Sequence, residues 1–197
     1  MLSKRIFDFV TALIGLILLL PLFVLVSCWI KLDSAGPVFI RQERVGRYGK
    51  LFSIFKFRTM AVNTETQGQI TVGRDARITG IGHLLRRYKI DELPQLINVL
   101  SGEMSLVGPR PEVPRYVACY PDTVRDLVLS VLPGITDWAS IEYKEENAIL
   151  GAAKDPELTY IEEILPIKLD YYVSYVKKRN FKMDLKIIFA TLIAIAD

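Results

Sequence analysis

The chain has 197 residues, which is enough for one domain with a hydrophobic core and too few for two large domains. Its two cysteines form no CxxC pair and it has one histidine, which argues against a disulfide framework, a Ser-His-Asp relay and a His-rich zinc site. The formal net charge is +3, but residues 41–89 carry 11 Lys/Arg against 3 Asp/Glu, and residues 90–197 carry 11 against 17. This asymmetry favours an anionic ligand beside the basic segment: nucleic acid, lipid headgroups or nucleotide phosphates.

Residues 9–30 form an uncharged, largely apolar run of 22 residues with Lys4 and Arg5 before it and Lys31 after it. This length is sufficient to cross a hydrocarbon core of roughly 30 Å. Pro21 lies near the middle, where it removes a backbone hydrogen bond and predicts a kink. A helix broken there could leave the membrane by the face it entered, and basic residues at both ends suit that topology. The residues alone leave crossing and re-entry open.

The remaining residues, 34–197, read as one unit without an internal repeat or a long linker. Alternating residues around two glycines predict a β-hairpin over 37–60. Apolar spacing of three and four predicts amphipathic helices, and the last apolar stretch is short for a membrane span. The predicted helices cover residues 80–90, 92–100, 123–132, 160–179 and 183–196. The fold class expected is α+β, mainly helical, with a small sheet and with amphipathic helices that lie at the membrane interface.

The stretch "DELPQLINVLSGEMSLVGPRP" (91–111) contains the residues that suggest chemistry. Asp91 is expected to be the N-cap of the 92–100 helix, which would keep its carboxylate ionised. Arg110 lies between two prolines, which restrict the backbone and suit a guanidinium that binds phosphate. Each feature alone is usually structural, but together with a membrane segment and a basic half they suggest attack of an aspartate on phosphorus. Mg²⁺ would screen the repulsion between the carboxylate and a diphosphate.

Together, "KFRTM" (56–60), the 91–111 stretch and "PGITDWA" (133–139) resemble the bacterial sugar transferases, or monotopic phosphoglycosyl transferases. The resemblance runs from "KRIFDF" (4–9) to "FKMDLKIIFATL" (181–192), and the chain looks like the minimal single-domain form. It implies a re-entrant membrane helix over residues 1–33, broken near Pro21, and a cytoplasmic catalytic domain over residues 34–197. The implied location is the cytoplasmic face of the bacterial inner membrane, among its phospholipids.

The resemblance also implies the reaction. A sugar 1-phosphate would move from a UDP-sugar to undecaprenyl phosphate, with release of UMP, at the first membrane step of a glycoconjugate pathway. Asp91 would be the nucleophile and a Mg²⁺ ligand, and Glu92 would support it through position or proton handling. The residues expected to bind phosphates or substrate are Lys56, Arg58, Arg86, Arg110 and Thr136. A homodimer is a possible assembly, and nucleic acid is not an expected partner because no helix-turn-helix or RNP pattern is present.

Two positions depart from the family pattern. The Ser-Pro pair that breaks the family's first helix reads Leu20-Pro21 here, and the nucleotide-sugar run after PGIT is replaced by "DWASIEYKEEN" (137–147). The identity of the sugar therefore does not follow from the resemblance. Two other functions stay open: a glycosyltransferase that releases UDP, and a non-catalytic protein that binds anionic lipids.

Overall fold

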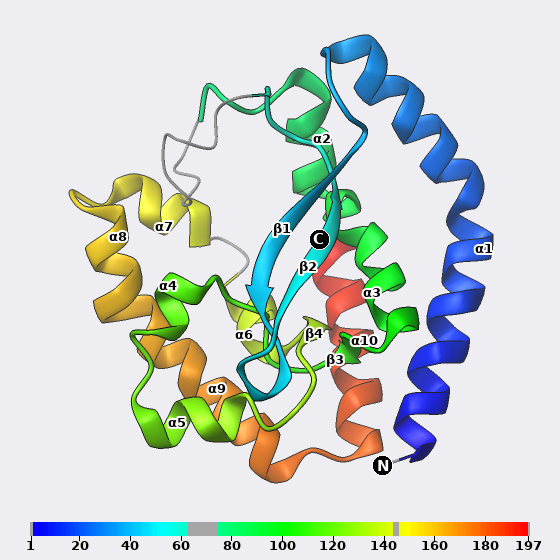
Figure 1. Cartoon of the computed structure of the whole chain (residues 1–197). Helices are drawn as coiled ribbons and strands as arrows, with labels where there is room; N and C mark the ends of the chain where they lie inside the picture. Colours follow the sequence, from blue (N-terminus) through cyan, green and yellow to red (C-terminus); the bar gives the residue numbers. More distant parts are fainter. Residues whose placement is uncertain (1, 63–74, 144–145, 197) are drawn as a thin grey trace.

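The computed structural model describes residues 2–62, 75–143 and 146–196, and Figure 1 shows the arrangement of its elements. A long β-hairpin runs through the middle, α1 (Leu2–Asp33) lies along one side, and several short helices gather on the other. Helix α10 (Phe181–Ala196) and helix α3 (Leu96–Ser101) lie between the hairpin and α1 in this view. The expected class, mainly helical with a small amount of sheet and a long apolar N-terminal helix, is confirmed.

Helix α1 is one continuous helix of 32 residues with Pro21 inside it, about 48 Å long at the standard rise. The break predicted near Pro21 is not observed. Proline removes only one backbone hydrogen bond, and the turn that follows is held by Phe23, Val26 and Ile30, which are buried against Phe57 of the hairpin and Leu85. The re-entrant topology therefore stays a prediction, because it depended on this break.

Polar side chains anchor the first turns of α1 to the rest of the domain. Asp8 is 2 % exposed and accepts a hydrogen bond from the Ser105 hydroxyl at 2.8 Å. Lys4 forms an ion pair of 2.7 Å with Asp184 of α10, and Arg5 donates to the last carbonyls of α3. The start of α1 is thus part of the folded domain, because its charged groups have partners there.

The predicted hairpin is confirmed. Strand β1 (Phe39–Val45) pairs antiparallel with β2 (Leu51–Phe57), with Phe39 opposite Phe57 and Val45 opposite Leu51. The 3₁₀ turn η1 (Arg47–Gly49) joins them, and its Gly49 has a φ of 75°, which glycine adopts at little cost. Successive residues of β1 face opposite sides of the hairpin, so Arg41 and Arg44 point in different directions.

The segment after the hairpin differs from its prediction. Helix α2 (Gly80–Arg87) forms as expected, but Asp91 does not cap a helix over 92–100. Residues Ile90–Gln95 form a 3₁₀ turn, η3, and α3 begins only at Leu96. Pro94 is the physical reason, because it has no N–H and disfavours the α conformation of the residue before it.

A second sheet has two parallel strands. It pairs β3 (Ser105–Val107) with β4 (Gly134–Thr136), and the backbone at Gly108 and Gly134 approaches so closely that a Cβ on Gly134 would lie 2.1 Å from the Gly108 nitrogen. The predicted 160–179 helix appears as the π-helical turn η4 (Tyr160–Ile164) followed by α9 (Leu165–Lys178). The other helices are α4 (Pro114–Val117), α5 (Asp122–Val128), α6 (Trp138–Glu142), α7 (Glu146–Ala152) and α8 (Pro156–Thr159).

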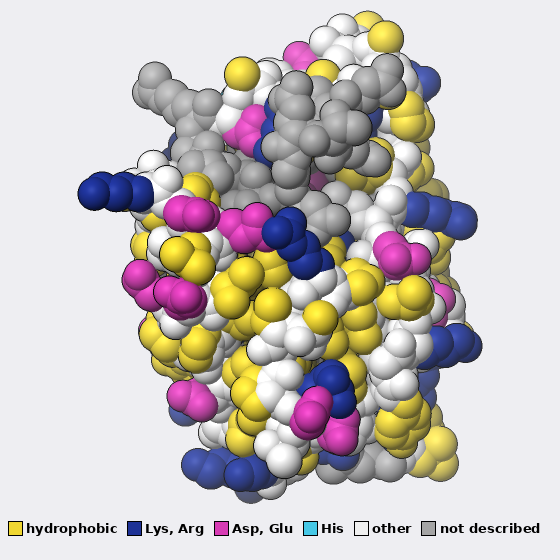
Figure 2. All heavy atoms as spheres, turned by 60° about the vertical axis from the view of Figure 1, so that its left-hand side comes forward, with side chains coloured by type: hydrophobic (Ala, Val, Ile, Leu, Met, Phe, Trp, Pro, Cys, Tyr) yellow, Lys and Arg dark blue, Asp and Glu magenta, His cyan; other side chains and the backbone are white. Residues whose placement is uncertain are grey.

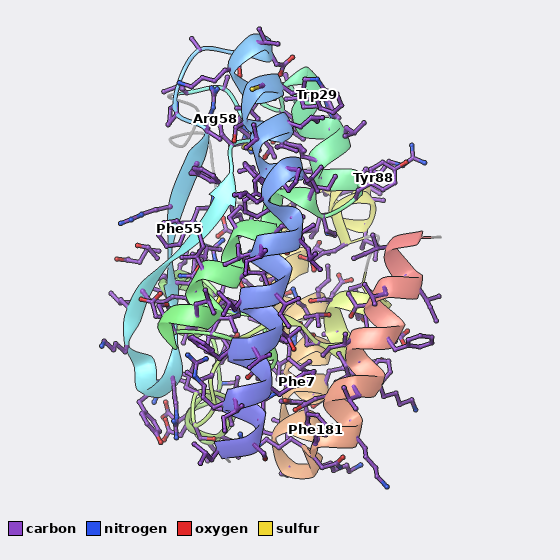
Figure 3. The ribbon with its side chains drawn as sticks, turned by 90° about the vertical axis from the view of Figure 1, so that its right-hand side faces the viewer. Phe7, Trp29, Phe55, Arg58, Tyr88 and Phe181 are labelled. Carbon is purple, nitrogen blue, oxygen red and sulfur yellow. The ribbon has the colours of Figure 1, made fainter. Side chains whose placement is uncertain are left out.

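Two faces of the molecule differ in their side chains. Figure 3 shows the face with α1 and α10, where Trp29, Tyr88 and Phe181 are each 45 % exposed. The large apolar side chains exposed on these two helices also include Leu13, Ile14, Ile17, Leu18, Leu20, Val24, Leu25, Leu185, Phe189, Leu192 and Ile193. On the face in Figure 2, charged side chains of both signs are spread among the hydrophobic ones. The most apolar part of α1 is 17 % buried, and α1 is long and apolar enough to cross a membrane.

Candidate active site

The side chain of Asp91 is enclosed but incompletely partnered. Lys89 has a φ of 54°, a left-handed conformation that is costly for a non-glycine residue, and it turns the chain into η3. η3 packs against β2, so Asp91 and Glu92 are buried, with 6 % and 8 % exposure. The Oδ1 atom of Asp91 is buried and has no hydrogen-bond partner among the described residues. Such an atom costs free energy unless a ligand satisfies it.

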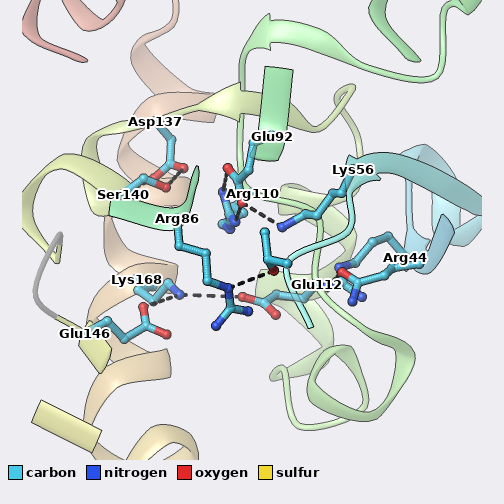
Figure 4. Close-up of polar contacts among 12 residues, drawn as sticks. Arg44, Lys56, Arg86, Glu92, Arg110, Glu112, Asp137, Ser140, Glu146 and Lys168 are labelled. Carbon is cyan, nitrogen blue, oxygen red and sulfur yellow. Dashed lines mark hydrogen bonds and ion pairs between the residues drawn. The ribbon is translucent and has the colours of Figure 1, made fainter. Parts of the chain in front are cut away.

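Glu92 is held by two cations (Figure 4). Its Oε1 accepts a hydrogen bond from Lys56 Nζ of β2 at 2.7 Å, and its Oε2 accepts one from Arg110 Nη1 at 3.1 Å. A second contact joins Arg110 Nη2 to Oε1, so the arginine binds the carboxylate through both nitrogens. The 91–111 stretch and "KFRTM" therefore meet in space, as the sequence predicted for Lys56, Asp91, Glu92 and Arg110.

The two adjacent carboxylates have opposite pKa shifts. Burial raises the pKa of Asp91, although Lys56 opposes that shift. Burial also acts on Glu92, but the charges of Arg110 and Lys56 prevail and lower the pKa of Glu92 well below its ordinary value. Glu92 is thus a fixed anion, whereas Asp91 is an enclosed carboxylate with a free oxygen. Two adjacent acids whose pKa values are shifted in opposite directions are typical of sites in which the two acids have different roles.

The other predicted phosphate ligands lie in different places. Arg86, on the last turn of α2, donates from Nε to the Thr59 hydroxyl at 3.2 Å, and Asp91 is the acid that interacts with it most strongly. Arg58 is not part of this cluster: it is 3 % exposed, and its guanidinium donates to the carbonyls of Ser34 and Ala35 after α1. Thr136 shares a hydrogen bond of 2.6 Å with Thr191 of α10. Of these three predicted residues, only Arg86 therefore lies beside Asp91, and Arg58 and Thr136 lie outside the site.

A second buried polar network adjoins Arg110, and the sequence analysis missed it. Glu112 accepts a hydrogen bond of 2.6 Å from the Tyr160 hydroxyl and lies 3.6 Å from Lys168 Nζ. Lys168 is 3 % exposed and also binds Glu146 of α7 at 2.9 Å (Figure 4). This network joins α7 and α9 to the loop that carries Arg110. Glu112 follows "GPRP" directly, and that adjacency was the one available signal in the sequence.

Asp137 occupies a position at which the chain departs from the family pattern. It is 2 % exposed and is the N-cap of α6, where it accepts hydrogen bonds from the Ser140 amide at 3.0 Å and the Ser140 hydroxyl at 2.6 Å. Burial raises the pKa of Asp137, and its charge in turn contributes to the raised pKa of Arg110. Asp137 therefore puts a carboxyl group near Arg110, the arginine that the sequence predicts to bind phosphate. Residues 144–145 of the same run lie outside the described residues.

The sequence matches known proteins along nearly its whole length. Residues 1–197 match the model of a family described as bacterial sugar transferase. The chain is 38 % identical over 192 residues to the UDP-N-acetylgalactosamine-undecaprenyl-phosphate N-acetylgalactosaminephosphotransferase of Aeromonas hydrophila, covering 96 % of this chain and 42 % of that protein. It is 37 % identical over 196 residues to the UDP-glucose:undecaprenyl-phosphate glucose-1-phosphate transferase of Escherichia coli K12, covering 97 % of this chain and 39 % of that protein.

A shorter relative aligns over most of its length. The uncharacterized sugar transferase EpsL of Bacillus subtilis is 36 % identical over 192 residues, which cover 98 % of this chain and 86 % of that protein. The chain thus spans about two fifths of the length of the first two relatives and most of the third. Because the family match extends over every residue, including the segments that supply Lys56, Asp91, Glu92 and Arg110, the chain belongs to the bacterial sugar transferase family.

Proposed function

We propose that this chain is a membrane-bound phosphoglycosyl transferase that moves a sugar 1-phosphate from a UDP-sugar to undecaprenyl phosphate and releases UMP. The observation that supports it best is the buried Asp91 carboxylate, whose free oxygen lies beside a Glu92 that Lys56 and Arg110 hold in place. The names of the relatives, which act on undecaprenyl phosphate and nucleotide sugars, agree with this substrate class.

The reaction would proceed in two displacements at one phosphorus. In the first, an Asp91 oxygen attacks the phosphorus that carries the sugar, the bond from this phosphorus to the bridging oxygen breaks, and UMP leaves with the electron pair. In the second, a phosphate oxygen of undecaprenyl phosphate attacks the same phosphorus and the acyl-phosphate bond breaks. The products are the lipid diphosphate sugar and a regenerated Asp91 carboxylate. Lys56, Arg86 and Arg110 would stabilise the negative charge on the phosphoryl oxygens.

The structure supports positioning as the role of Glu92. Both of its oxygens are bound by cations, and its lowered pKa keeps it ionised at neutral pH, so it is poorly suited to carry a proton. Its contribution would be to orient Lys56 and Arg110 toward the phosphates.

The described residues fit a magnesium ion with few protein ligands. They contain no group of three or more His, Cys, Asp or Glu side chains that could hold a metal, but the carboxyl oxygen Oδ1 of Asp91 has no hydrogen-bond partner among them. Mg²⁺ commonly takes one or two carboxylates and completes its shell with water and substrate phosphates. Asp91 would therefore hold the ion, which when bound would reduce the repulsion between a carboxylate and a diphosphate.

The exposed apolar face of α1 and α10 would contact lipid. Trp29 and Tyr88 on this face are of the kind found at membrane–water boundaries, and Lys4, Arg5 and Lys31 flank the apolar part of α1. Basic residues at both ends favour the re-entrant topology on the cytoplasmic face of the inner membrane. That arrangement would place the site within reach of a lipid phosphate.

The product released from the nucleotide sugar tests the proposed function. Purified protein in detergent, given Mg²⁺, undecaprenyl phosphate and a panel of UDP-sugars, is expected to release UMP with at least one of them. Quenched reactions lacking the lipid acceptor are expected to contain a phosphosugar adduct on the peptide that includes Asp91, seen by mass spectrometry. UDP in place of UMP would identify a glycosyltransferase instead. Lipid binding without either product would identify a non-catalytic lipid-binding protein.

The pH dependence of adduct formation should follow the raised pKa of Asp91. The carboxylate must be ionised to attack, so the rate is expected to fall as the pH drops through a value above the ordinary 3.8 of aspartic acid. Lys56→Met should move this acid limb to higher pH, because Lys56 is the neighbour that lowers the pKa of Asp91 most. Single-turnover rates between pH 4 and pH 8 would measure the acid limb of the wild type and that of Lys56→Met. A limb that stays in place in the variant would contradict the assignment.

A further inference from the structure

Arg44 is a cation beside the site that the sequence analysis did not single out. It lies near the end of β1 and is half-buried. Its guanidinium donates hydrogen bonds to the Glu43 carbonyl at 2.9 Å and to the Gln42 side-chain oxygen at 3.2 Å. Within the described residues it forms no ion pair with a carboxylate, whereas Lys56, Arg110 and Lys168 each do. A partly enclosed guanidinium without a counter-ion has donors available for an anionic ligand.

The register of the hairpin places Arg44 on the same face as Lys56. Lys56 is opposite Ile40, and Arg44 follows Ile40 by four residues, so both side chains project from one face at Cα positions roughly 13 Å apart. Arg110 lies on the loop that covers this face. The end of β1 is joined to that loop by a hydrogen bond of 2.9 Å from the Val45 amide to the Glu112 carbonyl.

The charged neighbours of Arg44 place it at the end of the site away from Asp91. Among the acids, Glu112 has the strongest electrostatic attraction to Arg44, and Glu92 has a weaker one. For Arg86, the acid with the strongest attraction is Asp91. Figure 4 shows Arg86 and Arg44 on opposite sides of the cluster. In a displacement at phosphorus, the attacking and leaving oxygens lie on opposite sides of the reacting atom. A cation at the Arg44 position would therefore face the leaving group and not the nucleophile.

We infer that Arg44 binds the phosphate of the leaving nucleotide, the one that stays with uridine. The inference rests on the proposed function and refines it: Lys56, Arg86 and Arg110 contact the transferred phosphoryl group, and Arg44 contacts its neighbour. Arg44 thus acts in the first displacement, which uses the nucleotide sugar. It has no role in the second, which uses undecaprenyl phosphate.

The test compares Arg44→Gln with Arg41→Gln. Arg41 lies on the same strand but on the opposite face, over the Phe55 ring at 4.6 Å, and is exposed, so it controls for loss of a positive charge. In calorimetric titrations with UMP and Mg²⁺, Arg44→Gln is expected to weaken binding by about 10- to 100-fold, the range for a lost hydrogen bond to a charged group. Arg41→Gln should bind UMP as the wild type does, and Arg44→Lys should recover part of the affinity.

Steady-state kinetics separate the two displacements. Arg44→Gln should lower kcat/KM for the UDP-sugar by a similar factor and leave kcat/KM for undecaprenyl phosphate unchanged. Unchanged UMP affinity in a variant that melts at the wild-type temperature would overturn the inference, as would equal losses for both substrates. Release of UDP by the wild-type protein would instead contradict the proposed function. The UMP titrations would still test whether Arg44 binds the nucleotide phosphate.

Discussion

Asp91→Asn is expected to abolish UMP release, with a loss of at least about 10⁴-fold, because an amide cannot form the acyl phosphate. The adduct on the Asp91 peptide should disappear as well. The variant should nevertheless fold, because the amide keeps the shape of the side chain in a position that is 6 % exposed. The measurement is UMP formation under single-turnover conditions, with Asp126→Asn on the surface of α5 as the matched control.

The same substitution should stabilise the protein. The pKa of Asp91 is raised in the folded state, so its ionised form destabilises the fold at every pH above that value. Removing the charge should raise the free energy of unfolding at neutral pH by about 1 kcal/mol, or the melting temperature by about 2–4 °C. The gain should shrink as the pH falls toward the ordinary pKa of aspartic acid. UMP release by Asp91→Asn would exclude the covalent mechanism. A melting temperature of Asp91→Asn below that of the wild type would contradict the direction of the pKa shift.

Glu92→Gln should have the largest effect on stability. It leaves Lys56 and Arg110 next to each other without their shared anion, and both are largely buried, with side-chain exposures of 13 % and 29 %. Breaking a buried pair from one side commonly costs 3–5 kcal/mol, and the partial exposure of Arg110 places the expected cost at about 3 kcal/mol. The corresponding drop in melting temperature is about 6–12 °C. Thermal unfolding in detergent at neutral pH would measure it.

A surface pair is the matched control for Glu92. Asp122 and Arg125 form an ion pair of 2.9 Å on α5 with side-chain exposures of 84 % and 38 %, so Asp122→Asn should cost less than about 1 kcal/mol. The effect of Glu92→Gln should also depend on pH. Because the folded pKa of Glu92 is lowered, its stabilising effect is present above the ordinary pKa of glutamic acid and is lost as the pH falls through the folded value. Equal losses in the two variants would show that the Glu92 cluster contributes no more than a surface pair.

The elements that depend on local sequence were predicted well. The length and composition of residues 9–30 predicted a long apolar helix, and the alternation around Gly46 and Gly49 predicted the hairpin, because these patterns reflect properties of neighbouring residues. The expected helix start at Asp91 was wrong because the effect of Pro94 on the preceding turn was underestimated. Tertiary packing kept α1 continuous at Pro21, where propensity alone predicted a break.

The site was predicted to the extent that its residues lie in short motifs. "KFRTM", "DE" and "GPRP" named Lys56, Asp91, Glu92 and Arg110, and the fold brings these residues together. Arg58 was included because it lies in the same motif as Lys56. Arg58 follows the last residue of β2, where the chain leaves the hairpin, and its guanidinium binds the carbonyls that follow α1.

The sequence by itself therefore determined the family, the membrane-length helix, the hairpin and the acidic pair with its principal cations. These follow from composition, periodicity and contiguous motifs, which do not require knowledge of distant contacts. Only the tertiary structure decided which oxygen of Asp91 is left free, which cations hold Glu92, and that Arg44 shares a face with Lys56. Those features depend on strand register and on burial between segments far apart in the chain, because a charge acquires its pKa and its partner only where the chain encloses it.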